Sequence, residues 1–414
     1  MMQLVEQHII LSNNKYYKEC DDLCFRGKNL YNVCLYLIKQ ENIKGNNILY
    51  NLYHLIKNTT EYKSLPSKVS ALLIIDIQKV YKSYFNLMKS YKINPSKFTG
   101  KPKLPKYLDK LKGRYYLNYS NQAISKKVFK KSGKIKLSQS NIEFKTKIRD
   151  FNIINCVRII PKLGYYVIEV VYTISNTELK SDNNNYGSID LGVNNLATLT
   201  SNIKGFKPKI INGKPLKSIN QYFNKELAEK RSVLIKRNKE YTSKAINKLS
   251  LKRKNKIDNY LHKASKTIIE ILTQNNINTL IIGKNQLWKQ ESSMGKVNNQ
   301  KFISIPHSRF IQMLEYKCEI KGINVILQEE SYTSKASFLN LDQIPIYKED
   351  DKTNYQFSGY RESRGIYKIK GKNLKINADV NGSYNIMRKG IPTAFANGIE
   401  GIEVCPEIIK ILKN

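Results

Sequence analysis

Acidic residues are scarce in this chain of 414 residues. Aspartate and glutamate together number 33 against 71 lysines and arginines, which gives a formal net charge of +38 at pH 7. So large an excess opposes a compact chain through self-repulsion, and a bound polyanion would relieve it. Nucleic acid is the usual polyanion, so the charge favours a nucleic-acid-binding protein. A codon bias toward Lys, Asn, Ile and Tyr is the alternative, but it does not explain why lysine so outnumbers glutamate.

Cysteines are also few, and long apolar runs are missing. The six cysteines are scattered along the chain, which predicts reduced thiols in a cytoplasmic, nucleoid-associated protein. Cys20 and Cys24 could share one helix face as half of a metal site, but no second pair with ligand spacing accompanies them. No apolar run approaches the ~20 residues of a membrane-spanning helix, so we expect no membrane partner.

The first 180 residues mix strand and helix signals. A strand-like run at the start precedes a long helical stretch, and a basic, proline-broken loop follows at 100–105. The β-rich segments after that loop include a turn at 161–164. We expect two units here: a β domain formed by 1–20 and 106–180, and a helical lobe inserted over 21–105.

Strand and helix signals alternate from residue 186 onward. A strand and a hairpin strand precede a long basic helical stretch, a buried strand at 279–282, a helix, and a strand at 323–328. This order is typical of an RNase H-like core, so we predict an α/β, multi-domain protein. The last residues read as a tail with a helical turn near Ile408. The predicted boundaries are a nuclease-type core at 186–332 and 376–414, and an irregular insert at 333–375.

Two aspartates lie where an RNase H-like core would hold metal ions. Asp190 ends the first strand of this half, where a carboxylate has no ordinary packing role, although bracing a turn is an alternative. Asp379 lies in Asn-Ala-Asp-Val-Asn-Gly, where capping a helix is the alternative. Phosphodiester hydrolysis of this type uses two divalent cations, one activating water and one stabilising the leaving oxygen. We therefore predict Asp190 and Asp379 as catalytic, metal-binding residues.

The segments around these aspartates resemble two motifs of one family. Ile-Asp-Leu-Gly at 189–192 is similar to the first RuvC motif of the TnpB-like transposon-encoded nucleases, and the segment at 377–386 is similar to their third. This family is related to the Fanzor proteins and to the type V CRISPR effectors. Further segments resemble the family in the same order: 65–69, 100–103, 259–266 and 330–335. Together the matches cover nearly the whole chain.

The resemblance implies an RNA-guided DNA endonuclease of a mobile element. Family members bind a guide RNA from their own locus, and part of it pairs with double-stranded target DNA beside a short adjacent motif. Their RuvC site then cuts DNA with Mg²⁺ or Mn²⁺. The resemblance also implies that the β domain is a wedge-type β-barrel around a helical recognition lobe. Base pairing reads the sequence in such proteins, so diffuse positive charge suits them. The alternatives are a nuclease-inactive, RNA-guided DNA-binding repressor and a transposase of the same fold.

One departure from the family pattern concerns the third carboxylate. The family places a glutamate after the strand at 279–282, whereas this chain has Gly-Lys-Asn at 283–285. Glu330, at the end of the next strand, is our predicted replacement, with Glu329 second because strand alternation lets only one point inward. Glu291 is a weaker candidate. The alternative is a solvated strand end and an inactive enzyme.

A second departure concerns zinc. The family carries a four-cysteine site in its insert, but Ser337 and Asn340 stand where the first cysteine pair would be. No cysteine or histidine occurs within 333–378, so we expect no structural zinc there. The segment 359–369 is predicted to form a metal-free hairpin or lid.

Basic side chains are dense in the loop near residue 100 and in the long helical stretch. A solvated face is the usual reason for a charge run, but acidic partners are too few here, so phosphate contact is the better interpretation. Tyr107, Tyr115 and Tyr116 near the loop could stack on bases, or could be ordinary core residues. The predicted nucleic-acid contacts are Lys101, Lys103, Lys230, Arg231, Lys236, Arg237, Lys252, Arg253, Lys254 and His262.

Overall fold

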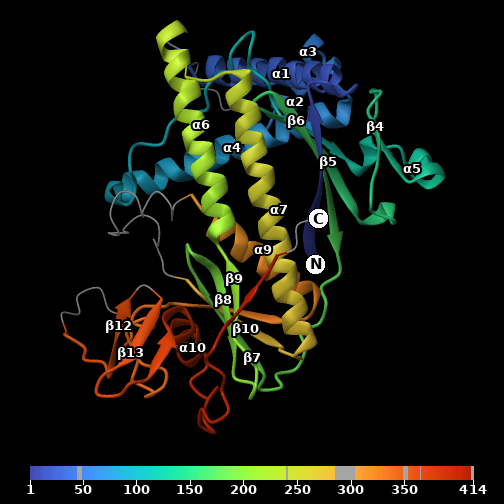
Figure 1. The fold of residues 1–414 in the computed structure, drawn as a ribbon. Coiled ribbons are helices and arrows are strands. Elements are labelled where there is room, and N and C mark those ends of the chain that lie inside the picture. The colour runs from blue at the N-terminus through green and yellow to red at the C-terminus, as the bar shows by residue number, and fades with distance from the viewer. Residues whose placement is uncertain (44–48, 239–240, 285–303, 348–352, 364, 412–414) are drawn as a thin grey trace. The chain divides into compact units, whose positions relative to one another are not determined.

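The computed structural model describes residues 1–43, 49–238, 241–284, 304–347, 353–363 and 365–411. The chain divides into two compact units, Met1–Ser175 and Asn176–Asn414. Both units contain helices and strands (Figure 1), and each has its own hydrophobic core. The protein is therefore multi-domain and of mixed α/β class, as predicted. Glu291 lies outside the described residues, and no described helix is both long and apolar enough to cross a membrane.

The first unit is built on a four-stranded antiparallel sheet in the order β1-β6-β5-β2. These strands are β1 (Met2–Leu11), β2 (Leu117–Ser120), β5 (Ile154–Lys162) and β6 (Tyr165–Ile174), and a separate hairpin pairs β3 (Lys134–Lys136) with β4 (Glu143–Lys145). β1 and β2 are the two edges, so the sheet is open. No closed barrel is found among the described strands, which corrects the barrel that the family resemblance implied.

Helices of the first unit share one core with this sheet. Leu30 and Leu35 of α1 and Tyr81 of α4 are fully buried in the same cluster as Tyr119 and Ile159 of the strands. The helical segment between β1 and β2 is thus packed as part of the unit rather than as a separate body. The helices are α1 (Tyr17–Ile43), α2 (Leu52–Ile56), α3 (Thr60–Lys63), α4 (Ser67–Ile93) and α5 (Lys126–Ser132), with 3₁₀ turns η1 (Pro95–Lys97), η2 (Asn121–Ala123) and η3 (Phe151–Ile153).

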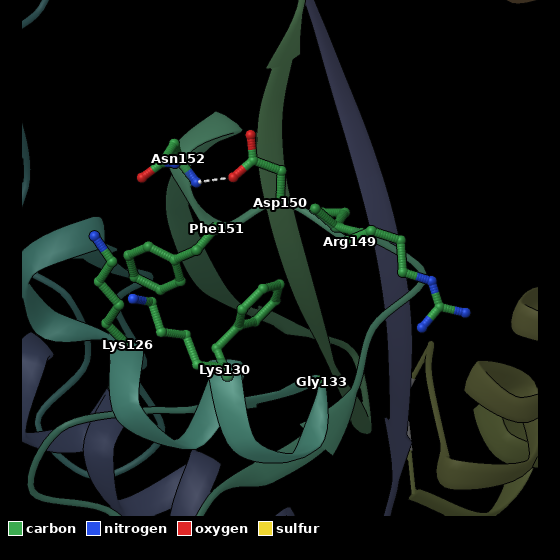
Figure 2. A pocket seen from close by; sticks show the side chains of 9 residues that line it. Lys126, Lys130, Gly133, Arg149, Asp150, Phe151 and Asn152 are labelled. Carbon is green, nitrogen blue, oxygen red and sulfur yellow. Dashed lines mark hydrogen bonds between the residues drawn. The ribbon is translucent and has the colours of Figure 1, made fainter.

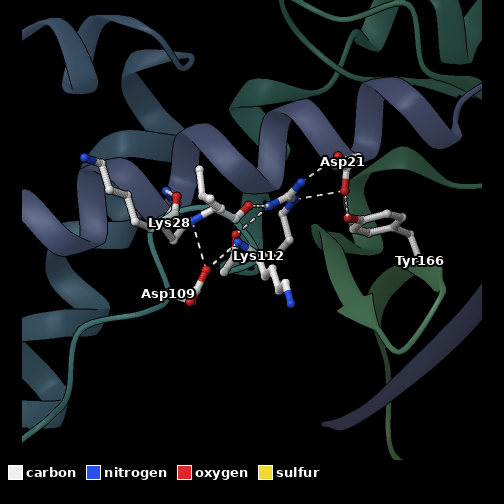
Figure 3. Close-up of polar contacts among 9 residues, drawn as sticks. Asp21, Lys28, Asp109, Lys112 and Tyr166 are labelled. Carbon is white, nitrogen blue, oxygen red and sulfur yellow. Dashed lines mark hydrogen bonds and ion pairs between the residues drawn. The ribbon is translucent and has the colours of Figure 1, made fainter. Parts of the chain in front are cut away.

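A polar network fastens α1 to the chain that follows the basic loop (Figure 3). Arg114 donates to both carboxylate oxygens of Asp21 at 2.8 Å, and the Tyr166 hydroxyl donates to Oδ1 of Asp21 at 2.6 Å. Lys28, only 2% exposed, donates to the Lys110 carbonyl at 2.7 Å. Arg114 holds the pKa of Asp21 below its ordinary value, and burial lowers the pKa of Lys28. These charges are satisfied internally, as buried charges must be.

The second unit contains a six-stranded mixed sheet in the order β11-β10-β7-β8-β9-β15. β7, β8 and β9 form an antiparallel meander, β10 and β11 continue parallel to β7, and β15 lies parallel to β9. The terminal strand β15 corrects the helical turn predicted near Ile408. The strands are β7 (Tyr186–Leu191), β8 (Asn195–Ser201), β9 (Lys209–Asn212), β10 (Thr279–Gly283), β11 (Asn324–Gln328) and β15 (Glu407–Ile409).

Strand alternation assigns the two faces of this sheet to different helices. Ile189 of β7 joins the core that α7 and α9 line, whereas Ser188 hydrogen-bonds Ser383 of α10 on the other face. Asp190, two residues after Ser188, therefore faces α10. The helices of this unit are α6 (Lys214–Asn238), α7 (Lys244–Gln274), α9 (His307–Ile320) and α10 (Ala378–Gly390).

The insert carries a small antiparallel sheet of β12 (Gly359–Ser363), β13 (Ile366–Ile369) and β14 (Lys375–Asn377). The pairing of β12 with β13 confirms the hairpin predicted at 359–369. Hydrogen bonds to Asp342 hold together the region where the family has zinc ligands. Oδ2 of Asp342 accepts from the backbone N–H of Ser337 at 2.9 Å and of Ser358 at 3.0 Å, while Oδ1 accepts from the Ser358 hydroxyl at 2.7 Å.

Candidate active site

Asp190 lies against the N-terminal half of α10. A Cβ atom added at Gly382 would lie 2.6 Å from Oδ2 of Asp190, so a residue without a side chain is what lets the helix approach this carboxylate. Burial raises the pKa of Asp190 well above its ordinary value, and the charges of Glu330 and Asp379 raise it further. Arg361 opposes this shift. Two carboxylates predicted from separate segments, Glu330 and Asp379, therefore both act on Asp190.

Gly283, at the end of β10, has no side chain, and this leaves room for the carboxylate of Glu330, which follows the neighbouring strand β11. A Cβ added at Gly283 would lie 2.5 Å from Oε2 of Glu330 and 2.6 Å from Cδ1 of Ile386. The carboxylate of Glu330 thus fills the space beside the residue that stands where the family has its glutamate. Burial raises the pKa of Glu330 to about 7; Glu329 adds to the shift and Lys389 reduces it.

Glu329 is engaged differently from its neighbour. Its Oε2 accepts from the amine of Lys389, whose side chain is 9% exposed, and its Oε1 accepts from the backbone N–H of Ser331 at 2.6 Å. Burial alone would raise the pKa of Glu329, but these hydrogen bonds hold it below the ordinary value. Glu329 therefore braces the end of β11, whereas Glu330 is the glutamate that acts on Asp190.

Asp379 lies in the first turn of α10 but does not cap it. The cap is Asn377, whose side chain accepts from the backbone N–H of Asp379 at 3.0 Å and of Val380 at 3.2 Å. The capping alternative for Asp379 is therefore wrong. Its carboxylate instead accepts from Nδ2 of Asn195 at 2.7 Å and from Nη2 of Arg361 at 3.3 Å.

Asn195 and Arg361 are site residues that the sequence reasoning missed. Asn195 begins β8, five residues after Asp190, so the Gly-Val-Asn-Asn turn that follows Asp190 was an available signal. Arg361 reaches Asp379 from β12 of the insert, and nothing in its local sequence marks it. The hairpin thus contributes the one cation among the described residues that both pairs with Asp379 and lowers the pKa of Asp190.

The donor set suits a hard divalent cation. Mg²⁺ binds carboxylate and water oxygens, and a cation would relieve the repulsion that raises the pKa values of Asp190 and Glu330. Among the described residues, no group of three or more Asp, Glu, His or Cys is arranged closely enough to hold a metal ion as it stands. Mg²⁺ usually keeps several bound waters, so it does not need a complete cage of protein ligands. Carboxylates that interact without forming such a cage are therefore compatible with Mg²⁺.

Most of the predicted phosphate-contacting side chains are exposed in the structure. These are Lys101, Lys103, Arg231, Lys236, Arg237, Lys252, Lys254 and His262. Lys230 pairs with Glu226 at 3.1 Å and Lys254 with Asp258 at 2.9 Å, both one helical turn apart on a helix surface. Such exposed pairs are weak, so they leave these lysines available to a phosphate.

Arg253 differs from the other basic residues. It donates to Oδ1 of Asn220 at 2.7 Å and to the Ser304 carbonyl at 3.3 Å, and it lies over the ring of Phe223. Burial lowers the pKa of Arg253. Its guanidinium therefore links α6 to α7 and to the segment before α9, which is a structural role.

The tyrosines near the basic loop also divide into two groups. Tyr115 is stacked between Tyr31 and Tyr116, with ring centroids 4.6 and 4.8 Å apart, and it packs against the core. Tyr107 is half exposed, with the amine of Lys39 over its ring at 3.9 Å. Tyr107 is accordingly the one of the three predicted tyrosines with a ring open to a base.

Two family models match segments of the second unit, and the first match begins in the last residues of the first unit. Residues 169–289 match the OrfB_IS605 family, described as "Probable transposase", and residues 307–386 match the "Cas12f1-like, TNB domain" family. The first match contains Asp190 and Gly283, and the second contains Glu330, Arg361 and Asp379. No curated protein matches the chain.

Several solved structures are distantly similar to the whole chain. A Cas12f1–sgRNA–target DNA complex is 16% identical, covers 94% of this chain and 100% of its own, and has a TM-score of 0.37. A CRISPR-Cas12f ternary complex is 16% identical with coverages of 89% and 80% and a TM-score of 0.32. C2c1 of Alicyclobacillus acidoterrestris with single-guide RNA is 8% identical with coverages of 91% and 70% and a TM-score of 0.40. These TM-scores lie below the level from which a shared fold follows.

Proposed function

Because this chain is a TnpB-like protein related to the type V CRISPR effectors, we propose that it is an RNA-guided DNA endonuclease. The order of its second sheet supports an RNase H-like, RuvC-type core: a three-stranded meander is flanked by two parallel strands that helices connect. The observation that carries the proposal is the position of Asp190 against Gly382 of α10, three residues after Asp379, together with the charges of Glu330 and Asp379, which both raise the pKa of Asp190.

Each residue of the site has a distinct part in the proposed hydrolysis. Asp190, Glu330 and Asp379 would hold the metal ions through carboxylate oxygens. Two Mg²⁺ or Mn²⁺ ions would supply an activated water and stabilise the leaving oxygen of the phosphodiester. Asn195 fixes one oxygen of Asp379 by its hydrogen bond, and Arg361 places a positive charge where the DNA phosphate approaches. Glu329 and Lys389 fix the strand end that carries Glu330.

The proposed partners are a guide RNA from the protein's own locus and double-stranded target DNA. The net charge of +38 supports both, because neutralising phosphates releases counterions and drives binding. The exposed cations of α6 and α7 support backbone contact rather than base reading.

The decisive experiment is cleavage of a plasmid library with randomised flanks by protein purified with its co-expressed flanking RNA. Asp190→Ala and Glu330→Ala should each abolish cleavage, and Glu329→Gln is the matched control because it removes the charge but keeps an acceptor at the same strand end. Cuts that need RNA, Mg²⁺, Asp190 and Glu330 support the proposal. Cuts that survive Glu330→Ala but not Glu329→Gln would transfer the metal-binding role to Glu329.

Two rival functions have a specific observation behind each. The glycine at the family's glutamate position and the absence of a preformed metal cage among the described residues favour a nuclease-inactive repressor. RNA-dependent DNA binding without cuts would establish it. The description of the OrfB_IS605 model favours a transposase, which would join transposon ends to target DNA without any RNA. A preparation that binds no RNA and transfers strands would replace the proposed function.

A further inference from the structure

A pocket of about 460 Å³ opens in the first unit beside α5 (Figure 2). Its volume falls in the ~300–1,000 Å³ range of small-molecule sites. It lies in a unit that contains none of the predicted carboxylates. The residues that line it come from α5, from the turn after α5 and from η3 with the residues before it: Lys126, Phe129, Lys130, Gly133, Ile148, Arg149, Asp150, Phe151 and Asn152.

The pocket combines an apolar base with an accessible aromatic ring. Phe129 and Ile148 are buried, and the half-buried ring of Phe151 packs edge-on to Phe129 at 5.4 Å. Figure 2 shows the amino ends of Lys126 and Lys130 beside the ring of Phe151, and the Lys126 amine is 5.9 Å from its centroid. A flat apolar surface thus lies directly beside two positive charges.

These charges have no acidic partner of their own. Lys126, Lys130 and Arg149 are exposed, and none of them forms a salt bridge with a carboxylate in the described part of the chain. The one acid of the pocket, Asp150, already accepts a hydrogen bond from the Asn152 backbone N–H at 2.9 Å. The excess of positive charge therefore favours an anionic ligand. A flat group of that ligand, such as an aromatic ring, would lie against the ring of Phe151.

A second hollow continues from the first. It measures about 540 Å³ and shares Ile148 and Arg149 with the pocket, so Arg149 stands between the two. Figure 2 shows Arg149 extending away from Lys126 and Lys130. The second hollow adds Lys147, the ring of Tyr172 and the carboxylate of Glu6, which already accepts from the Thr146 hydroxyl at 2.7 Å and from the Lys147 backbone N–H at 3.0 Å. Charges and rings that repeat along a path fit a chain of repeating units rather than a single small anion.

We propose that this pocket holds one nucleotide of a bound single-stranded nucleic acid. Its base lies against Phe151, its phosphate meets Lys126 and Lys130, and Arg149 meets the next phosphate along the strand. The inference rests on the proposed function only in taking the guide RNA as the strand that arrives there. Base stacking on an aromatic ring tolerates any base, so the pocket anchors the strand without reading its sequence.

Two double variants of α5 test whether Lys126 and Lys130 contact a phosphate of the strand. Lys126→Ala/Lys130→Ala removes the pocket amines, and Lys127→Ala/Lys131→Ala removes the same charge from exposed residues that do not line the pocket. The probe is a fluorescein-labelled oligouridine of about 15 nucleotides, bound to the full chain and followed by anisotropy at several salt concentrations. The pocket pair should lower affinity about tenfold and reduce the salt slope by about 0.7, because both amines meet the same phosphate and each phosphate contact of a single strand contributes ~0.7. Equal effects of the two pairs overturn the proposal.

Cross-linking tests whether a base of the strand lies against the ring of Phe151. With 4-thiouridine in the probe, we expect an adduct on the peptide containing Phe151. The adduct should be lost in Phe151→Leu and kept in Phe151→Tyr. An adduct that survives Phe151→Leu, or none in the wild type, overturns the placement of the base. Because these readouts need no cleavage, they separate this inference from the proposed nuclease activity: a protein that cuts no DNA can still bind the strand here.

Discussion

At the residue scale, the site depends on carboxylates kept in surroundings that favour their protonated forms. Burial and the charges of Glu330 and Asp379 raise the pKa of Asp190 well above its ordinary value, and burial and the charge of Glu329 raise that of Glu330 to about 7. Metal ions bind the deprotonated forms, so binding must displace protons below that range. The same repulsion that opposes charge in the metal-free site is the interaction that a cation would relieve.

We therefore predict that Mg²⁺ affinity rises as pH increases through about 7, the pKa of Glu330. Calorimetry in buffers of different ionisation enthalpy should detect proton release near pH 6 and much less near pH 8. Glu330→Gln should weaken binding and remove most of this pH dependence. Glu329→Gln is the control, because the pKa of Glu329 is already below its ordinary value. Mg²⁺ affinity that does not change between pH 6 and 8 would contradict the assignment of Glu330 as a ligand.

The stability of the protein without added metal should fall, rather than rise, as pH increases toward 7. The pKa of Glu330 is raised from 4.5 to about 7 on folding, so the folded state binds the proton more tightly. Its contribution to the free energy of unfolding is complete below about pH 4.5 and is lost as pH rises to about 7. The melting temperature should thus fall more over this window in the wild type than in Glu330→Gln. An identical pH dependence in the two proteins would show that Glu330 titrates at its ordinary value.

Gly283 provides a third prediction at this scale. A methyl group there would lie within 2.6 Å of both the Glu330 carboxylate and Ile386, so Gly283→Ala must displace Glu330 or α10. We expect a loss of about 1–3 kcal/mol of stability, as for other overpacked sites, and at least tenfold slower cleavage. Gly365→Ala, which meets nothing within 4 Å, is the control. Cleavage at the wild-type rate in Gly283→Ala would mean that the position of Glu330 is not critical.

At the element scale, the long basic stretch proves to be two helices with different tasks for their cations. Lys236 and Arg237 end α6 as exposed residues, whereas Arg253 of α7 is held by Asn220 and Ser304. Lys236→Gln/Arg237→Gln should weaken nucleic-acid binding and reduce the salt slope by about 0.7–0.9 per lost contact, with little change in melting temperature. Arg253→Gln should instead cost about 1–3 kcal/mol of stability. Equal loss of stability in both variants would contradict this division.

The elements themselves were largely predictable, because each follows from a local pattern. Short apolar runs predict the strands at 279–282 and 323–328, and Gly322 ends the predicted helix that contains α9. The partners of those elements were less accessible. β15 pairs with β9 about two hundred positions earlier in the chain, and three residues give too short a run to distinguish a strand from a helical turn. The barrel failed for a similar reason, since closure depends on edge pairing that no local pattern encodes.

The candidate site likewise contains residues that local sequence patterns predict and residues that only the fold brings together. Asp190 and Asp379 were identified because a carboxylate at a strand end or a helix start is unusual in a chain with so few acids. Glu330 followed from the neighbouring strand end, but the reason it fits, the vacant space at Gly283, needs coordinates. Arg361 was missed because only the folding of β12 onto α10 brings it to Asp379. Contacts between distant segments are the part that sequence patterns leave open.

At the scale of the whole molecule, the charge of +38 sets how stability responds to salt. Repulsion among like charges destabilises the free chain, and salt screens it, with a Debye length of ~10 Å at 0.1 M and ~3 Å at 1 M. Bound RNA stabilises by occupying the folded state, but its affinity falls steeply as salt rises. Salt should therefore act in opposite directions on the free and the RNA-bound protein.

We predict that NaCl raised from about 0.05 to about 0.5 M increases the melting temperature of the free protein and shrinks the extra stability that RNA provides. Differential scanning fluorimetry with and without the co-purified RNA should give two curves that converge at high salt. Sodium chloride is the appropriate salt because sulfate would stabilise any protein by exclusion from its surface. A free protein that loses stability as NaCl rises would mean that attractive ion pairs, such as that of Arg114 with Asp21, outweigh the repulsion. RNA would then serve as a ligand of particular sites and not as the counterion of the whole fold.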